Sequence, residues 1–182
     1  MTHDPKAIAN YFIELAEAEG TKVTPLQLIK LVYIAHGWYL GLTKEPLINE
    51  PPEAWRYGPV IPSLYHALKI HGNDVVTQKI SDFELIPGAE IRFANVVVAP
   101  PSDVRIRKFL DSVWRAYGHL SGLQLSALTH QPNTPWYDTW EKQGAKYTKG
   151  FDIPEESIIR HYQELNAKNA RTNESSAAAA RG

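Results

Sequence analysis

A serine and a histidine spaced four residues apart are the first candidates for chemistry in this chain. Ser126 and His130 would share one face of a helix, where they could serve as nucleophile and general base of a hydrolase. A serine in such a place is more often a helix cap, or a hydroxyl bonded to the preceding turn. No Gly-x-Ser-x-Gly turn surrounds Ser126, and the chain has no cysteine to act as another nucleophile. The hydrolase therefore stays a minor alternative.

Seven histidines raise the question of a metal site. The zinc-protease pattern needs two histidines four apart on a helix, with a glutamate between them. His66 and His71 are five apart, which places them on different faces of a helix, and His119 and His130 belong to different segments. No glycine-rich loop is followed by the lysine of a phosphate-binding loop. The sequence predicts neither a metal nor a cofactor.

Composition and charge narrow the class of protein. The chain has 182 residues, 43% of them hydrophobic, which suits one globular domain with a sizeable core. Lysine and arginine number 19 against 20 acidic residues, so no basic excess predicts direct binding of nucleic acid. The longest apolar stretch, 28–42, contains Lys30 and His36 and is too short to span a bilayer. Without cysteines or a recognisable signal peptide, we expect a cytoplasmic protein without membrane partners.

The first half of the chain predicts three helices. Asp4-Pro5 is a typical helix start, and Thr24-Pro25 begins a second helix that reaches about Leu40. Because residues 26–40 are apolar on most sides, we expect this helix to be buried at the centre of the fold. A third helix is predicted from about 60 to 71. The proline-rich segment before it is interpreted as a loop, with a short strand near Leu47.

The second half combines a hairpin with further helices. The strand-like runs "DFELI" and "FANVVVA", separated by Pro87-Gly88, predict a small β-hairpin between 80 and 100. Ser102 is expected to cap an amphipathic helix, shorter helices follow at 121–129 and from Thr134, and the last helix is expected to end near Leu165. The predicted fold is mainly α: one compact helical domain over 1–166, with a central buried helix and a small β-hairpin. Residues 167–182 lack an apolar face, so we expect a flexible tail.

The segment "AWRYGPVIPSLYHAL" places aromatic residues directly before the third predicted helix. Gly58-Pro59 indicates a rigid turn, since glycine permits unusual backbone angles and proline fixes its own φ. A plain connector would not need Trp55, Arg56 and Tyr57 beside it. These side chains either anchor the turn to the core or present themselves to a partner. Tryptophan, tyrosine and arginine are the types that dominate interface energetics.

The sequence predicts which aromatic residues are anchors and which face a partner. We expect Trp55 and Trp136 to be buried anchors. We expect Arg56 and Tyr57 to face a partner, and Tyr137, beside another turn-forming proline, to do the same. If these residues are not the interface, Tyr11 on the first helix is the next candidate.

Three segments together resemble the SocA-like antitoxin family, also called the Panacea domain. They are "TPLQLIKLVYIAHGWYL", "AWRYGPVIPSLYHAL" and "LSGLQLSALTHQPNTPW". Their shared pattern is a Lys-Leu-x-Tyr helix, a Trp-x-x-Gly-Pro-Val turn, and a Leu-Thr-His segment followed by Pro-Trp. The residues that carry this pattern here are Lys30, Tyr33, Trp55, Gly58, Pro59, His130 and Trp136. The resemblance covers residues 5 to 165.

The resemblance implies a mainly helical, non-enzymatic protein of the kind found on phages and mobile elements. It implies an antitoxin whose partner is a cognate protein toxin, neutralised by direct, stoichiometric binding. The alternative that it leaves open is a proteolytic adaptor that delivers the toxin to a cytosolic protease, with the tail as a tether. The hydrolase that would use Ser126 and His130 is the second alternative.

Overall fold

The computed structural model describes residues 2–86, 92–148 and 150–179. Its helices are α1 (Pro5–Ala18), α2 (Pro25–Thr43), α3 (Pro62–Leu68), α4 (Val104–Tyr117), α5 (Gly122–Thr129), α6 (Pro135–Tyr137) and α7 (Glu155–Ala179). Short 3-10 turns at Lys69–His71 and Ala145–Tyr147, and a π-helical turn at Asp138–Lys142, complete the helical part. Two antiparallel hairpins pair β1 (Glu53–Trp55) with β2 (Gly58–Val60) and β3 (Ser81–Ile86) with β4 (Arg92–Val97). The mainly α prediction is confirmed.

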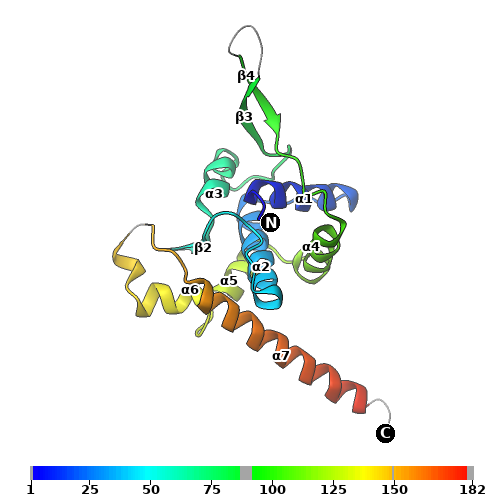
Figure 1. Ribbon diagram of the computed structural model, residues 1–182, viewed down its shortest axis with the longest axis vertical. Coiled ribbons are helices and arrows are strands. Elements are labelled where there is room, and N and C mark those ends of the chain that lie inside the picture. Colours follow the sequence, from blue (N-terminus) through cyan, green and yellow to red (C-terminus); the bar gives the residue numbers. More distant parts are fainter. Residues whose placement is uncertain (1, 87–91, 149, 180–182) are drawn as a thin grey trace.

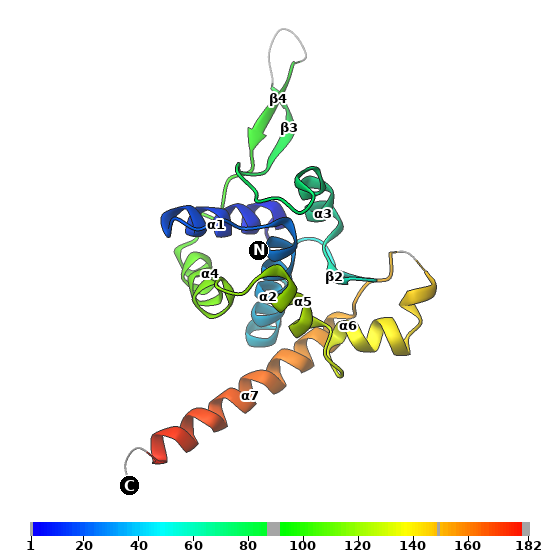
Figure 2. The ribbon, with the colours of Figure 1, turned by 180° about the vertical axis from the view of Figure 1, so that it is seen from behind.

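Helix α2 runs through the middle of the molecule, as predicted. Thr24 caps it by accepting the N–H of Gln27 at 3.3 Å, and Pro25 occupies its first turn. Helices α1, α4, α5 and α7 surround it (Figures 1 and 2). Because neighbours cover it on several sides, the helix is buried from Leu28 to Gly37 without interruption.

Helix α7 packs closely across α2 and then continues well past it. A Cβ added to Gly37 would lie 2.1 Å from the ring of Tyr162, and one added to Gly41 would lie 2.6 Å from that residue's Cβ. The two glycines therefore let α7 approach α2. The helix ends at Ala179, so the expected end near Leu165 is wrong (Figure 1). Among the described parts of the chain, no helix is long and apolar enough to cross a membrane.

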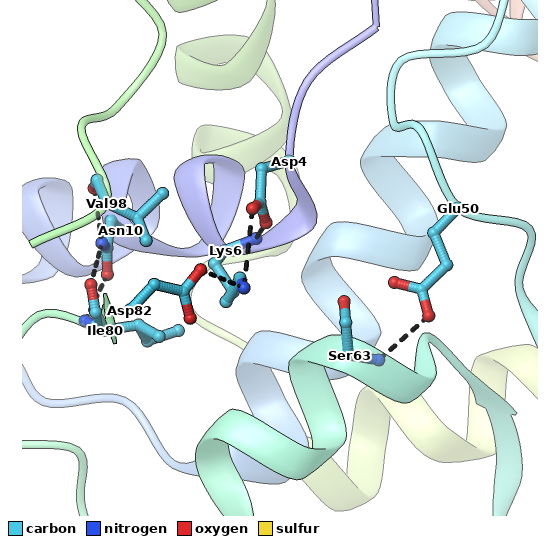
Figure 3. Close-up of polar contacts among 8 residues, drawn as sticks. All are labelled: Asp4, Lys6, Asn10, Glu50, Ser63, Ile80, Asp82 and Val98. Carbon is cyan, nitrogen blue, oxygen red and sulfur yellow. Dashed lines mark hydrogen bonds and ion pairs between the residues drawn. The ribbon is translucent and has the colours of Figure 1, made fainter. Parts of the chain in front are cut away.

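The proline-rich segment before α3 contains more regular structure than expected. Trp55 pairs with Gly58 and Glu53 with Val60, which forms the small β1–β2 hairpin in place of the predicted loop. The expected strand near Leu47 is a single bridge between His3 and Ile48. Glu50 accepts the backbone N–H of Ser63 at 3.0 Å and so satisfies the start of α3 (Figure 3).

The predicted hairpin between 80 and 100 is confirmed as β3–β4. Its six residue pairs run from Ser81 opposite Val97 to Ile86 opposite Arg92. The hairpin projects from the helical body beyond α1 (Figures 1 and 2). The Pro87-Gly88 turn expected at its end lies outside the described residues. Helix α4, which follows, is capped by Asp103, whose carboxylate accepts the N–H of Arg105 at 2.8 Å; the expectation that Ser102 is the cap was wrong by one residue.

Candidate partner-binding site

A buried lysine holds the turn between β1 and β2 from inside. Lys30 on α2 is completely buried, and its Nζ donates to the backbone oxygens of Tyr57 and Pro59, each at 2.9 Å. No carboxylate among the described residues pairs with it. Burial in this apolar surrounding lowers the pKa of Lys30 to about 7. A neutral amine has two hydrogens, one for each carbonyl oxygen, so the side chain remains satisfied without its charge.

Gly58 is the point at which the three family-like segments meet. Its φ is +101°, a conformation that side chains rarely adopt. A Cβ at this position would lie 2.4 Å from Nζ of Lys30 and 2.6 Å from Cε1 of His130. Glycine is therefore required twice at this position, once by the backbone angle and once by the space that Lys30 and His130 occupy.

His130 and Ser126 lie within reach of each other, but in the geometry of a helix end. The Oγ of Ser126 is 3.3 Å from Nδ1 of His130, while the carbonyl oxygen of Ser126 is only 2.6 Å from the same nitrogen. A nitrogen that close to a carbonyl oxygen carries the hydrogen and donates it, so it has no lone pair for the serine. Burial lowers the pKa of His130, with an opposing contribution from its hydrogen bond to Ser126. The pair is arranged as a helix cap, not as nucleophile and base.

Trp136 fixes the other side of the turn. Its Nε1 donates to the backbone oxygen of Trp55 at 2.8 Å, and its ring centroid lies 4.1 Å from that of His130. Trp140 stacks on it at 5.9 Å with an interplanar angle of 13°, as their spacing of four residues predicts. Trp136 is buried, as expected.

Trp55 differs from the prediction, because it is only partly buried. Its Nε1 donates to Glu53 at 2.7 Å, and its ring meets Tyr65 edge-on at 4.9 Å. The backbone oxygen of Trp55 is held by Trp136, and its partly buried side chain packs against the edge of the core. Tyr33, the remaining motif residue, is buried on α2, and this burial raises its pKa.

The outer side of the turn presents Arg56 and Tyr57, the two residues expected to face a partner. The side chain of Tyr57 is 72% exposed, and the guanidinium of Arg56, which makes no ion pair with a described residue, lies 5.5 Å from its ring centroid. Next to them is a groove of about 610 Å³, which we call the turn groove. Its principal lining residues are Glu53, Trp55, Arg56, Trp140, Lys146 and Tyr147. The sequence did not indicate this groove, because residues 140–147 carry no spacing signal that would place them beside Trp55.

The other two candidate contact residues are less accessible than expected. Tyr137 is half-buried, and Lys142 lies over its ring at 6.0 Å. Tyr11 is buried: its hydroxyl donates to Asp111 at 2.8 Å, and Arg107 covers its ring at 5.1 Å. Tyr11 therefore links α1 to α4 and does not offer a free surface to a partner.

Four residues from distant parts of the sequence meet at one turn: Lys30, Gly58, His130 and Trp136. The family model described as "Antitoxin SocA-like, Panacea domain" matches residues 28–137, the stretch that holds these four residues. This protein belongs to the SocA-like antitoxin family. It is also similar to the protein named Antitoxin SocA from Caulobacter vibrioides (strain NA1000 / CB15N). The two are 32% identical over 133 residues, which cover 73% of this chain and 68% of the relative. No solved structure matches the chain.

The Panacea-domain match covers the part of the fold that contains the β1–β2 turn. It begins on α2 and ends at α6, so it includes Lys30, His130 and Trp136 around the β1–β2 turn and leaves out α1 and α7. The backbone bond from Ala54 to Phe151, which also holds β1, lies partly outside it. The motif residues Lys30, Gly58 and Trp136 all lie on the inner side of that turn. Arg56 and Tyr57 lie on its outer side, and both are exposed. No three His, Asp or Glu side chains gather to hold a metal in the part of the chain that the structure describes.

Proposed function

We propose that this protein is the antitoxin of a toxin–antitoxin pair and that it neutralises its toxin by direct binding through the outer side of the β1–β2 turn. One observation supports this most: Lys30 is buried without a counter-ion and holds the backbone of Tyr57, whose side chain is 72% exposed. Burying an amine costs free energy. The folded protein bears this cost at a turn that directs the aromatic side chain of Tyr57 outward.

The physical advantage is preorganisation. The turn is fixed by two hydrogen bonds from Lys30 and one from Trp136, so Arg56 and Tyr57 lose little conformational entropy when a partner binds. The unpaired guanidinium of Arg56 can donate two parallel hydrogen bonds to a carboxylate. Tyr57 and the neighbouring turn groove supply aromatic surface. The partner surface that fits this site is acidic at its centre with an apolar border.

Co-expression with the product of an adjacent reading frame tests the proposed function. That product, placed under an inducible promoter, should stop growth, and this protein should restore growth and co-purify with it in a fixed ratio. Growth arrest that this protein does not relieve, or relief without co-purification, contradicts direct neutralisation.

A charge reversal at Arg56 tests the proposed surface. Arg56→Glu should weaken the complex by about 2 kcal/mol or more if Arg56 meets a buried carboxylate. Arg115→Glu is the matched control, since Arg115 is also exposed and bonds only within α4. Both variants should melt like the unchanged protein. Equal binding by both variants in a titration would place the interface elsewhere.

The extension of α7 supports an adaptor role as the second candidate. Residues 166–172 follow the partly buried Leu165 and are all exposed, so they are free for contact with a protease. A chain that ends at residue 166 separates the two roles. Under direct neutralisation it still binds the toxin and restores growth, whereas under the adaptor role it binds the toxin but no longer shortens the toxin's lifetime.

A further inference from the structure

One face of the β3–β4 hairpin is uncharged and mostly apolar along its described length. Side chains alternate between the two faces of a strand, and Phe83 and Leu85 lie on the same face as the residues opposite them, Asn95 and Phe93. Val97, opposite Ser81, continues this face. We call Phe83, Leu85, Phe93 and Val97 the hairpin face. The reverse side carries Asp82 and Glu84, so the charges of β3 are all on the other side.

The hairpin face is open to solvent. The exposed fractions are 81% for Phe83, 70% for Phe93, 57% for Leu85 and 49% for Val97. Taking roughly 200 Å² for an aromatic side chain and somewhat less for leucine and valine, these fractions amount to about 450 Å² of exposed apolar surface. The largest apolar patch on a typical monomeric protein measures about 300–600 Å² and is often a functional site, and the hairpin face falls in this range.

The base of the hairpin is fixed to the helical body. Asn10, completely buried on α1, donates to the backbone oxygens of Ile80 at 2.8 Å and Val98 at 2.7 Å, and accepts the N–H of Ile80 at 2.7 Å (Figure 3). Lys6 forms an ion pair with Asp82, the second residue of β3. Burying an asparagine costs free energy unless its amide is fully hydrogen-bonded, and here its three bonds go to the residues that flank β3 and β4. An ordinary surface loop would not need this buried support. The two strands therefore leave the body in a set direction.

The geometry points to the hairpin face as an apolar contact surface for the toxin. This inference rests on the proposed function, to which it adds a second surface with a different chemistry. The face bears no charge, since its two polar members are Ser81 and Asn95. The toxin surface that fits it is uncharged and apolar, with room for two phenylalanine rings, in contrast to the acidic surface that fits Arg56.

The available area favours a different protein over a second copy of this chain. Two hairpin faces packed on each other would bury about 900 Å² in total, whereas stable specific interfaces bury about 1,200–2,000 Å². Because the hairpin projects from the body, two hairpins in contact would hold the helical bodies apart and gain little more area (Figure 2). A partner that receives the hairpin in a concave surface can also contact its edges and base, and so reach the required area.

A double variant tests the inference in the full-length protein. Phe83→Thr with Phe93→Thr removes both rings and introduces β-branched threonines, which favour strands. The probe is the growth-arresting product of the adjacent reading frame. We expect its affinity to fall by about 30-fold or more, the loss that marks an energetic centre of an interface. The matched control is Glu84→Thr with Ala94→Thr, a cross-strand pair on the reverse side, for which we expect a change below about threefold.

A thiol measurement keeps the test decisive if the double variant does not fold. The chain has no cysteine, so Asn95→Cys introduces a single thiol on the hairpin face. Bound toxin should slow its reaction with a maleimide at least tenfold. Ser112→Cys, exposed on α4, should react at the same rate with and without the toxin.

The possible results are distinct. Unchanged toxin affinity in the double variant, or equal labelling of Asn95→Cys with and without toxin, overturns the hairpin inference and leaves the proposed function standing if the unchanged protein still binds and neutralises. A dimer in light scattering that the double variant dissociates, with toxin affinity unchanged, assigns the face to self-association and also overturns it. Failure of the unchanged protein to bind the toxin removes the proposed function and this inference together.

Discussion

The indole of Trp136 donates its Nε1 hydrogen to the backbone oxygen of Trp55 across 2.8 Å, although the two residues are 81 positions apart. This bond joins the second half of the chain to the β1–β2 turn, whose next residues are held by Lys30. The turn is thereby held by two elements that are distant in sequence. Its outer residues gain a fixed position without contributing to the core.

Replacing each of these two tryptophans by alanine compares how much each side chain contributes to stability. Trp136→Ala should lower the free energy of unfolding by about 3–5 kcal/mol, because it removes a buried ring and leaves the Trp55 oxygen without its donor. Trp55→Ala should cost less, roughly 1–2 kcal/mol, because its ring is only partly buried. Denaturant titrations of both variants measure the difference. A larger loss for Trp55 would show that its side chain, not its backbone, anchors the turn.

Gly58→Ala should destabilise the fold more than its backbone angle alone requires. The positive φ costs about 1–2 kcal/mol for alanine, and displacing Lys30 or His130 adds roughly 1–3 kcal/mol. Gly20→Ala is the matched control, since its φ is +68° and nothing lies within 4 Å of the added Cβ. Thermal melts of the two variants should differ clearly. Equal shifts would mean that Lys30 and His130 rearrange without cost.

The buried lysine predicts a stability that rises with pH. The pKa of Lys30 is about 7 in the folded protein and near 10.4 in an unfolded chain. Between these values the unfolded state binds a proton that the folded state does not, so the free energy of unfolding increases by up to about 4 kcal/mol from pH 7 to pH 10. Below pH 7 both states bind the proton, and the full cost of the buried charge is present.

Comparison with Lys30→Met isolates this effect, because methionine cannot titrate and other groups cancel in the difference. His130 contacts the same turn, but its pKa is lowered from 6.5, so its titration lies below this window. Chemical denaturation at several pH values should give a difference between the two proteins that grows in favour of lysine as pH rises. A difference that is flat from pH 7 to 10 would mean that Lys30 stays charged.

Removal of the residues after position 166 should leave the fold intact. Residues 166–172 are exposed, so they contribute little buried apolar surface. The truncated chain should melt within about 2 °C of the full-length protein. Tyr162→Ala is the contrast within the same helix, because Tyr162 fills the space left by Gly37 and Gly41 and its loss opens a cavity. A large drop on truncation would show that the end of α7 contributes to stability.

Local signals in the sequence determined most of the elements. The apolar composition of residues 26–40 indicated a central helix, and the two strand-like runs after residue 80 indicated the β3–β4 hairpin. These features could be predicted because periodicity and turn residues act over short distances. The end of α7 could not be predicted, because residues 166–179 have no apolar face from which a helix could be inferred.

The candidate site, too, could be predicted only in part from the sequence. The sequence by itself indicated a turn near Gly58-Pro59, because glycine and proline act on their immediate neighbours. The structure moves the turn by two residues: Arg56 and Tyr57 form it, and Gly58 and Pro59 begin β2. Only the tertiary structure decided that Lys30 and Trp136 both hold this turn, that Trp55 is only partly buried, and that Tyr11 is buried against Asp111. Each of these contacts joins residues 27 to 100 positions apart. Their geometry depends on how whole helices pack against each other, which local spacing does not specify.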